Sequence, residues 1–185
     1  MGSKITRNHR ENLIAQKGKV IWLTGLSGSG KTTIAQALEV KLHNDLGFLT
    51  YVLDGDVLRS GLNFDLNMSL IGRSENIRRA AHVAALFADA GVVVICAFIS
   101  PYKSARDTVR RIMEVPFFEV YVKCPIEECK SRDPKGLYAK CDAGDITGFT
   151  GIDAPYEEPA NSELVVETDV EDVNSCVDKI IELIK

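Results

Sequence analysis

The segment GLSGSGKT, residues 25–32, constrains the fold of this chain more than any other stretch. It matches the phosphate-binding pattern GxxxxGK[ST] in full, and it lies between the β-rich run KVIWLTG and a helical pattern over residues 32–47. Glycines at these positions let successive backbone N–H groups turn inward around a phosphate, and the helix N-terminus adds partial positive charge. The alternative, a glycine-rich turn that contains a lysine by coincidence, would not require both flanking elements. The segment therefore predicts nucleoside triphosphate binding by a strand–loop–helix unit.

Each residue type in the segment has its own expected task. Lys31 reaches the β- and γ-phosphates and is a catalytic candidate, while the hydroxyl of Thr32 is a ligand for Mg²⁺. The candidate ATP-binding residues in the segment and directly after it are Gly25, Ser27, Gly28, Ser29, Gly30, Lys31, Thr32 and Thr33.

Strand and helix patterns alternate along the rest of the chain. Apolar runs predict strands at 19–25, 49–56, 92–100, 117–124 and 163–168, and helical patterns follow at about 73–90, 103–114, after Pro125 and near the C-terminus. Continuous apolar strands separated by helices indicate a mostly parallel sheet with helices on both faces. We therefore expect an α/β, P-loop kinase-like three-layer sandwich. A chain of 185 residues suggests a single domain, here 19–185, preceded by a flexible polar tail at 1–18.

Residues 135–161, the lid segment, interrupt this alternation. The segment holds several glycines, two prolines and three aromatic residues without clear periodicity. Irregular segments of this length in a compact domain are usually functional or disordered. The aromatic residues favour a lid that becomes ordered on a ligand over plain disorder.

Composition excludes several classes of protein. The net charge is −4, and 45% of the residues are hydrophobic, which indicates neither disorder nor general nucleic-acid binding. An odd count of five cysteines without a CxxC pair argues against a disulfide framework and a zinc site, and favours a reducing, cytoplasmic compartment. The longest apolar run, AGVVVICAFI, is far shorter than the roughly 20 residues that cross a membrane. We expect no nucleic-acid or membrane partner.

Carboxylates follow the second predicted strand rather than the third. In many phosphate-binding α/β proteins a central strand ends in an acid that helps to hold magnesium, but the apolar run 92–100 ends in Ser100. The nearest acids at a strand end are Asp54 and Asp56. Because parallel strands share one carboxyl edge, Asp54 would face the phosphate loop and orient a magnesium-bound water or accept a proton from an attacking hydroxyl. A carboxylate-rich turn around Gly55 is the plainer alternative.

A second cationic cluster lies downstream. Arg59 and Arg73 are expected near the same sheet edge, with Asn76 about one turn after Arg73. Planar guanidinium donors suit a second anion, so the cluster predicts a phosphoryl acceptor with its own negative charge.

Several segments in sequence order resemble the adenylylsulfate (adenosine 5′-phosphosulfate, APS) kinase family. They are GLSGSGKTT, DGDVLRSGLN, RSENIRR, FADAG, FISPY, RDPKGLY and GFTGIDAPYE, and the resemblance runs from about Lys19 to the C-terminus. The resemblance implies a homodimer that transfers the γ-phosphoryl group of ATP to the 3′-hydroxyl of APS. The products would be ADP and 3′-phosphoadenylylsulfate (PAPS), in sulfate assimilation.

The resemblance also implies roles for individual residues. It places Arg132 against the ATP adenine, with Cys176 lining the same pocket. The family usually has an aromatic residue where this chain has Met68, and Phe64 is the alternative contact. The residues implied to bind APS are Asp56, Arg59, Met68, Arg73, Asn76, Ile99, Ser100, Lys135, Gly148 and Phe149.

Two routes of phosphoryl transfer are open at this point. In direct in-line transfer, Asp54 accepts or orients the acceptor proton; in the covalent route Ser100, which the family pattern labels a phosphoserine intermediate, is phosphorylated first. A serine nucleophile needs an activating base, and no histidine lies close to Ser100 in the sequence. We therefore favour direct transfer with Ser100 as an APS ligand. Two rival functions remain, another small-molecule P-loop kinase and a non-catalytic nucleotide-binding regulator.

Overall fold

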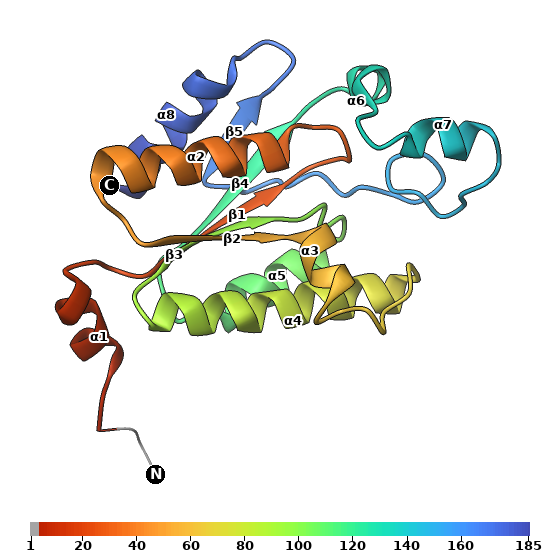
Figure 1. Ribbon diagram of the computed structural model, residues 1–185. Coiled ribbons are helices and arrows are strands. Elements are labelled where there is room, and N and C mark those ends of the chain that lie inside the picture. Colours follow the sequence, from red (N-terminus) through yellow and green to blue (C-terminus); the bar gives the residue numbers. More distant parts are fainter. Residues whose placement is uncertain (1–3) are drawn as a thin grey trace.

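A single parallel sheet organises the computed structural model, which describes residues 4–185. Within this range the strands are β1 (Lys19–Thr24), β2 (Thr50–Asp54), β3 (Val93–Ala97), β4 (Phe117–Lys123) and β5 (Leu164–Glu167). Their order across the sheet is β2-β3-β1-β4-β5, and every pair is parallel. The strand that precedes the phosphate loop, β1, therefore lies in the middle of the sheet (Figure 1).

Helices cover both faces of the sheet, as the sequence predicted. Helices α2 (Lys31–Leu46) and α8 (Val173–Ile184) lie over one face, and α4 (Leu70–Asp89) and α5 (Lys103–Ile112) lie over the other (Figure 1). Three short helices lie toward the carboxyl edge of the strands: α3 (Gly55–Ser60), α6 (Ile126–Arg132) and α7 (Leu137–Asp142). No helix in residues 4–185 is long and apolar enough to span a lipid bilayer.

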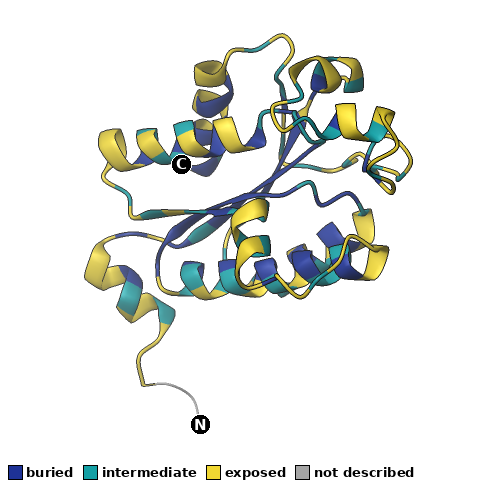
Figure 2. Cartoon of the chain, turned by 45° about the vertical axis from the view of Figure 1, so that its right-hand side comes forward, coloured by how far each residue is buried: buried dark blue, intermediate teal, exposed yellow. Residues whose placement is uncertain are grey.

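The central strand shows why the two faces need helices. In β1, Ile21 and Leu23 pack into the core beneath α2 and α8, while Val20 and Trp22 pack into the core against α4 and α5. All four side chains are fully buried, and Figure 2 shows this burial along the strands and on the inward sides of the helices. Burial of each such side chain contributes about 1.5–3 kcal/mol, so the two cores stabilise the layers on either side of the sheet.

Helix α2 follows the predicted pattern from its apolar face to its end. Ile34, Leu38 and Leu42 are at most 1% exposed and face the sheet. The helix ends at Gly47, whose φ of +67° is the left-handed conformation that glycine adopts without strain. Local sequence was enough to predict this helix, because the apolar periodicity and the glycine at its end both indicate the same boundaries.

Two local features differ from the sequence prediction. Helix α4 begins at Leu70 rather than near Arg73, because the Ser69 hydroxyl accepts a hydrogen bond from the Gly72 N–H and caps the helix there. The lid segment, expected to lack regular structure, contains α7. The carboxylate of Asp133 accepts hydrogen bonds from three successive backbone N–H groups at the start of α7, those of residues 137–139.

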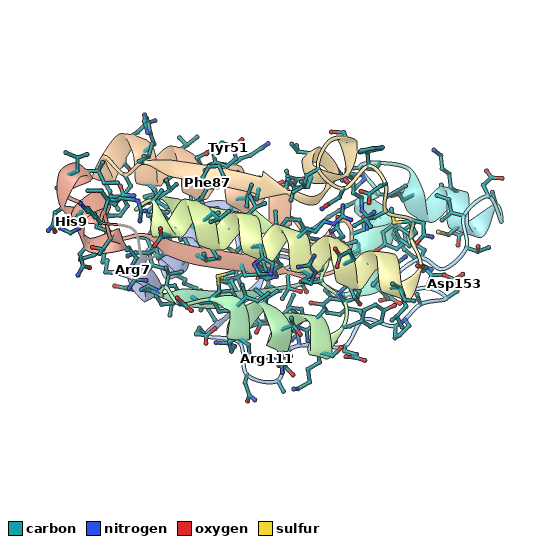
Figure 3. The ribbon with its side chains drawn as sticks, turned by 90° about the horizontal axis from the view of Figure 1, so that it is seen from below. Arg7, His9, Tyr51, Phe87, Arg111 and Asp153 are labelled. Atoms are coloured by element: carbon teal, nitrogen blue, oxygen red, sulfur yellow. The ribbon has the colours of Figure 1, made fainter. Side chains whose placement is uncertain are left out.

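The predicted flexible tail needs correction over residues 7–18. Residues 1–3 lie outside the described part of the chain, but Arg7–Ile14 form helix α1 at the end of the molecule opposite the lid. Figure 3 shows Arg7 and His9 at one end and Asp153 of the lid segment at the other. Arg7 donates to the Glu114 carbonyl at 2.6 Å. Long-range polar contacts of this kind leave no periodic signal in a short polar stretch, so local pattern missed them.

Gln16 joins this N-terminal segment to the sheet. Its side chain is buried and donates to the carbonyls of Leu49 (2.9 Å) and Gly91 (2.7 Å), while its oxygen accepts from the Leu49 N–H at 2.8 Å. The two partners lie in the connections that enter β2 and β3.

We predict that Gln16→Ala lowers the free energy of unfolding by about 2 kcal/mol, because it removes the side-chain partner of the buried Gly91 carbonyl and of the Leu49 N–H. Urea denaturation measures this change. Leu13→Ala is the matched control, since Leu13 is 87% exposed and should cost little. An equal loss in both variants would show that the amide contacts are unimportant.

Candidate active site

A cavity of about 1290 Å³ opens at the carboxyl edge of the sheet, with the phosphate loop on one side and helix α4 on the other. It brings together most of the residues that the sequence suggested. The predicted residues that line it are Ser27, Gly28, Gly30, Lys31, Thr32, Thr33, Asp54, Asp56, Arg59, Met68, Arg73, Asn76, Ile99, Ser100, Arg132, Lys135, Gly148, Phe149 and Cys176. Gly25 and Ser29 are not part of this lining, and neither is Phe64, the alternative to Met68, which is 80% exposed.

The phosphate loop needs glycine at Gly25 and Gly28 because other chain segments approach it closely. A Cβ atom at Gly25 would lie 2.4 Å from the Val122 carbonyl oxygen, and one at Gly28 would lie 2.8 Å from that of Cys129. Gly28 also has a φ of +77°, in the region that glycine tolerates best. Gly25 and the buried Ser29 therefore shape the loop from behind rather than facing the cavity.

Lys31 is the buried cation of the loop. Its ammonium donates to the carbonyls of Gly25 (3.0 Å) and Leu26 (2.6 Å), and burial lowers the pKa of Lys31 to about 8. A buried ammonium held by two carbonyl dipoles gains stability from an arriving anion, since a nearby negative charge offsets the cost of desolvation.

Thr32 and Asp54 form a pair of oxygen donors beside this cation. The Thr32 hydroxyl donates to Asp54 Oδ2 at 2.8 Å, and Asp54 Oδ1 accepts the Asp56 N–H at 2.9 Å as the cap of α3. Among residues 4–185 no group of three or more His, Cys, Asp or Glu side chains is arranged to hold a metal ion. A cation here would take one or two protein oxygens and complete its shell with phosphate and water, which is the coordination that Mg²⁺ favours.

The opposite side of the cavity is positively charged. Burial lowers the pKa of Arg59, and the positive charge of nearby Arg73 lowers it further. Two guanidinium groups that disfavour each other's charge form a site that an anion would stabilise. Asn76 is buried next to them and accepts from the Asn63 amide at 3.0 Å, so its own NH₂ group remains for the cavity.

The lid segment contacts the positively charged side of the cavity. Arg73 donates to the Met68 carbonyl at 3.0 Å and also to the Thr150 hydroxyl and the Gly148 carbonyl. Lys135, at the start of the segment, forms an ion pair with Asp56. The ordered segment therefore already closes part of the cavity in this structure.

Two aromatic side chains of the lid segment, Tyr138 and Phe149, pack against the phosphate loop. Phe149 is 9% exposed and meets Tyr138 edge to face, with ring centroids 5.1 Å apart. The Tyr138 hydroxyl donates to the Ser27 carbonyl at 2.9 Å. Phe149 lines the cavity from this packed position, so the lid and the phosphate loop are physically connected.

Ser100 is almost fully buried, with 1% exposure, and its hydroxyl is engaged on both sides. It accepts from the Trp22 indole N–H at 3.2 Å and donates to the Thr24 hydroxyl at 2.8 Å. Thr24 in turn donates to the Ile99 carbonyl at 2.8 Å. The Ser100 proton is therefore directed to another hydroxyl within the wall of the cavity.

Thr168 is a cavity residue that sequence reasoning missed. Its hydroxyl donates to the Ser29 carbonyl at 2.9 Å, and Arg132 donates to its carbonyl at 2.7 Å and its hydroxyl at 3.2 Å. These bonds fix the phosphate loop against the end of β5, next to the predicted adenine contacts. The signal was present, since Thr168 ends a predicted strand at the edge where polar residues gather.

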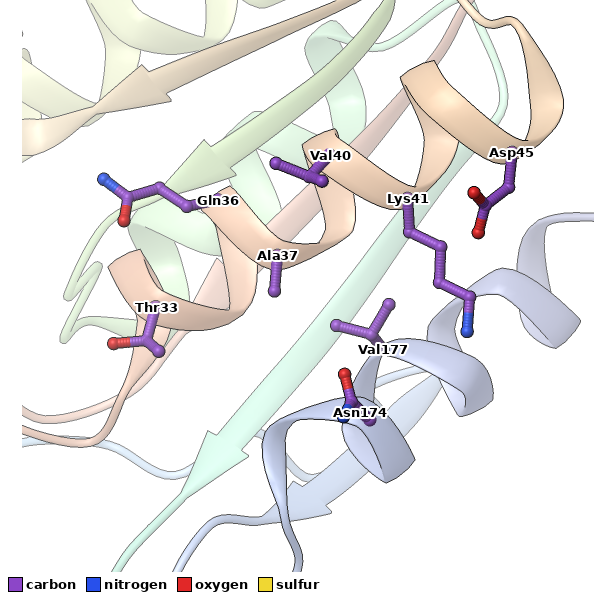
Figure 4. A pocket seen from close by; sticks show the side chains of 8 residues that line it. All are labelled: Thr33, Gln36, Ala37, Val40, Lys41, Asp45, Asn174 and Val177. Carbon is purple, nitrogen blue, oxygen red and sulfur yellow. The ribbon is translucent and has the colours of Figure 1, made fainter.

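A second hollow of about 600 Å³ lies between α2 and α8 and has a different character. Figure 4 shows Lys41 reaching from α2 toward α8, with Asn174 and Val177 facing it. Lys41 forms an ion pair with Asp178, and the remaining lining is a mixture of polar and small aliphatic side chains from the two helices. The phosphate loop, the acids and the arginines meet in the larger cavity, which is therefore the candidate active site.

Comparisons with known proteins agree with this assignment. The family model for adenylylsulphate kinase matches residues 17–167. The adenylyl-sulfate kinase of Clostridium acetobutylicum is 54% identical over 183 residues, which cover 99% of this chain and 91% of that protein.

Solved structures show the same similarity. The Mycobacterium tuberculosis APS kinase in complex with AMPPNP and APS has a TM-score of 0.88 and 46% identity, and the match covers 91% of this chain and 98% of that one. The hexameric APS kinase of Thiobacillus denitrificans has a TM-score of 0.69 and 29% identity, and the match covers 94% of this chain and 29% of that longer one.

We predict that nucleoside triphosphate binding weakens as the pH rises through about 8. Below this value Lys31 is mainly protonated and attracts phosphate; above it the free protein holds a neutral amine that must gain a proton before it can pair with the ligand. The affinity for the nucleotide should fall by up to about tenfold per pH unit above the pKa that Lys31 has in the ligand-free protein. Titration with a fluorescent ATP analogue measures the change.

Lys31→Arg is the control for this titration, because the guanidinium stays charged throughout the range. Its affinity should be lower but nearly independent of pH between about pH 7 and 9.5. A parallel decline in both proteins would refute the assignment to Lys31.

Proposed function

This chain belongs to the adenylylsulfate kinase family, and we propose that its cavity carries out the family reaction by direct in-line transfer. The enzyme transfers the γ-phosphoryl group of ATP to the 3′-hydroxyl of APS, forming PAPS and ADP in sulfate assimilation. Membership of this family decides against the two rivals, a kinase for another small molecule and a non-catalytic regulator.

ATP would lie with its phosphates in the loop of residues 25–33 and its adenine toward Arg132 and Cys176. The position of Lys31 in the cavity lining and the positive φ angles of Gly28 and Gly30 support the phosphate end of this placement. Arg132 and Cys176 line the cavity near the end of β5, which supports the adenine end.

APS would occupy the cationic side of the cavity. Arg59, Arg73 and Lys135 supply positive charge there, in a protein whose net charge is negative, and this suits the phosphosulfate of the acceptor. Met68 lines this side while Phe64 does not, which favours Met68 as the residue in the usual aromatic position. A thioether can pack flat on an adenine ring.

Each reacting group has a residue to direct it in this proposal. Asp54 orients the 3′-hydroxyl of APS or accepts its proton, and its second oxygen keeps Thr32 in place. Lys31 offsets negative charge on the transferred phosphoryl group. Mg²⁺, for which the Thr32 hydroxyl and a water held by Asp54 are suitable ligands, would neutralise phosphate charge when bound.

The environment of Ser100 is the observation that favours direct transfer. Its hydroxyl lies between the Trp22 N–H and the Thr24 hydroxyl, and it has 1% exposure. A nucleophilic serine needs a base that takes its proton. Here the proton goes to a hydroxyl with no useful basicity, so Ser100 suits a structural and binding role in the acceptor wall.

Assembly and location remain predictions of the family resemblance. We propose a homodimer in the cytoplasm, formed from a single kinase domain over residues 19–185. Large apolar side chains exposed at the start of α4, such as Leu70 and Ile71, support a partner surface.

We predict that Asp54→Ala lowers kcat by about 100-fold or more, because proton transfer and the position of Thr32 both depend on this carboxylate. ATP-analogue affinity should be largely retained. A coupled assay with ATP and APS measures kcat, and Asp45→Ala, an exposed carboxylate at the far end of α2, is the control. An unchanged kcat in Asp54→Ala would refute its role.

We predict that Ser100→Ala keeps near-normal kcat at saturating APS and raises the KM for APS, because Ser100 binds the acceptor without taking the phosphoryl group. Steady-state kinetics with varied APS measures both constants. Total loss of turnover with intact APS binding would support the covalent route instead.

A further inference from the structure

Arg106 of α5 is a buried cation outside the set of residues that sequence and family resemblance suggested. Its side chain is 4% exposed, although a guanidinium is costly to bury. Nη1 donates to the Ser100 carbonyl at 2.8 Å, and Nη2 donates to the Glu157 carbonyl at 2.6 Å. One side chain therefore contacts both the acceptor wall and the C-terminal part of the lid segment.

Ser100 needs support of this kind because its backbone is unusual. Its φ is +40°, in the left-handed region that non-glycine residues adopt at a cost of about 1 kcal/mol or more. In this conformation its hydroxyl bonds with Trp22 and Thr24 while its carbonyl accepts from Arg106. The hydrogen bond from a charged donor offsets the conformational cost.

The chain that leaves the lid is bonded to the same wall. The Glu157 N–H donates to the Pro101 carbonyl at 2.8 Å, and the Glu157 carboxylate accepts the Lys103 N–H at 2.6 Å. The hydroxyls of Tyr156 and Thr24 lie 3.0 Å apart. Arg106 completes this set of contacts, because Nη1 bonds to the backbone of the wall at Ser100 and Nη2 bonds to the backbone of the lid segment at Glu157.

The guanidinium of Arg106 is itself held in one orientation. Its Nε lies 2.9 Å from Glu119 Oε1 on β4, and its Cζ atom lies over the Tyr156 ring, 5.9 Å from the ring centroid. Glu119 also pairs with Arg110 at 3.1 Å. A charged fork fixed in this way can direct two hydrogen bonds with little loss of side-chain entropy.

We propose that Arg106 is a positioning residue for the acceptor site. It keeps Ser100 in its left-handed conformation and attaches the end of the lid segment to the same wall. The wall and the lid segment therefore hold the same relative position when APS binds between them. The inference rests on the proposed placement of APS against Ser100. Loss of Arg106 should therefore lower the affinity for APS and leave the affinity for ATP unchanged.

Arg106→Lys tests this proposal, because lysine keeps the charge but cannot direct two parallel hydrogen bonds. We expect the KM for APS to rise about tenfold, corresponding to the loss of one charge-assisted hydrogen bond. ATP-analogue affinity should change less than about twofold. Arg111→Lys on the same helix, where the exposed Arg111 bonds to the Thr108 hydroxyl, should behave as the unmodified enzyme.

A second set of variants separates positioning from a general loss of stability. Glycine adopts positive φ without strain, and glycine and alanine lack the Ser100 hydroxyl alike, so Arg106→Lys combined with Ser100→Gly should have a lower KM for APS than Arg106→Lys combined with Ser100→Ala. If Arg106→Lys fails to fold, as judged by its Tm, the double variant Arg106→Met with Glu119→Gln removes the buried charge pair and is measured in its place.

The outcomes are distinct. A KM for APS that is unchanged in the folded Arg106 variants, or an equal loss of ATP and APS affinity, would overturn the inference. Equal behaviour of the glycine and alanine double variants would do so as well. APS-dependent turnover missing from the unmodified enzyme and from Arg111→Lys would instead overturn the proposed function on which the inference rests.

Discussion

The placement of the phosphate loop at the carboxyl end of the central strand is the constraint on which the rest of the structure depends. Because all strands of the sheet are parallel, each connection that follows a strand begins at the same edge. Asp54 comes from β2, Ser100 follows β3, and Arg132 and Thr168 follow β4 and β5. Residues more than 100 positions apart in the chain thus meet around one phosphate site.

Charge within the cavity is controlled by pairing each cation with a polar partner before substrate arrives. Lys31 donates to loop carbonyls, Arg73 donates to the lid, and Lys135 pairs with Asp56. These partners reduce the cost of holding cations close together, while leaving interactions that anionic substrates can strengthen. A chain with a net charge of −4 can thereby bind two anionic nucleotides.

The lid is attached to both halves of the site, which explains its order in this structure. Near its beginning, Tyr138 donates to the phosphate loop at Ser27; near its end, Glu157 is bonded to the wall that holds Ser100. A segment connected in this way touches both the phosphate loop and the wall around Ser100, so a change at either place is transmitted to it through direct hydrogen bonds.

The sequence by itself determined the phosphate loop, the alternation of strands and helices, and the set of charged residues at the strand ends. Each of these depends on local rules: glycine conformation, apolar periodicity and the shared edge of parallel strands. Only the tertiary structure decided that residues 7–14 form a helix, that Met68 rather than Phe64 lines the cavity, and that Thr168 and Arg106 bond to backbone around the cavity. It also decided the left-handed backbone and the enclosed hydroxyl of Ser100. The contacts of Thr168, Arg106 and Ser100 include hydrogen bonds between segments far apart in the chain, and a buried polar group's choice of partner leaves no periodic trace in sequence.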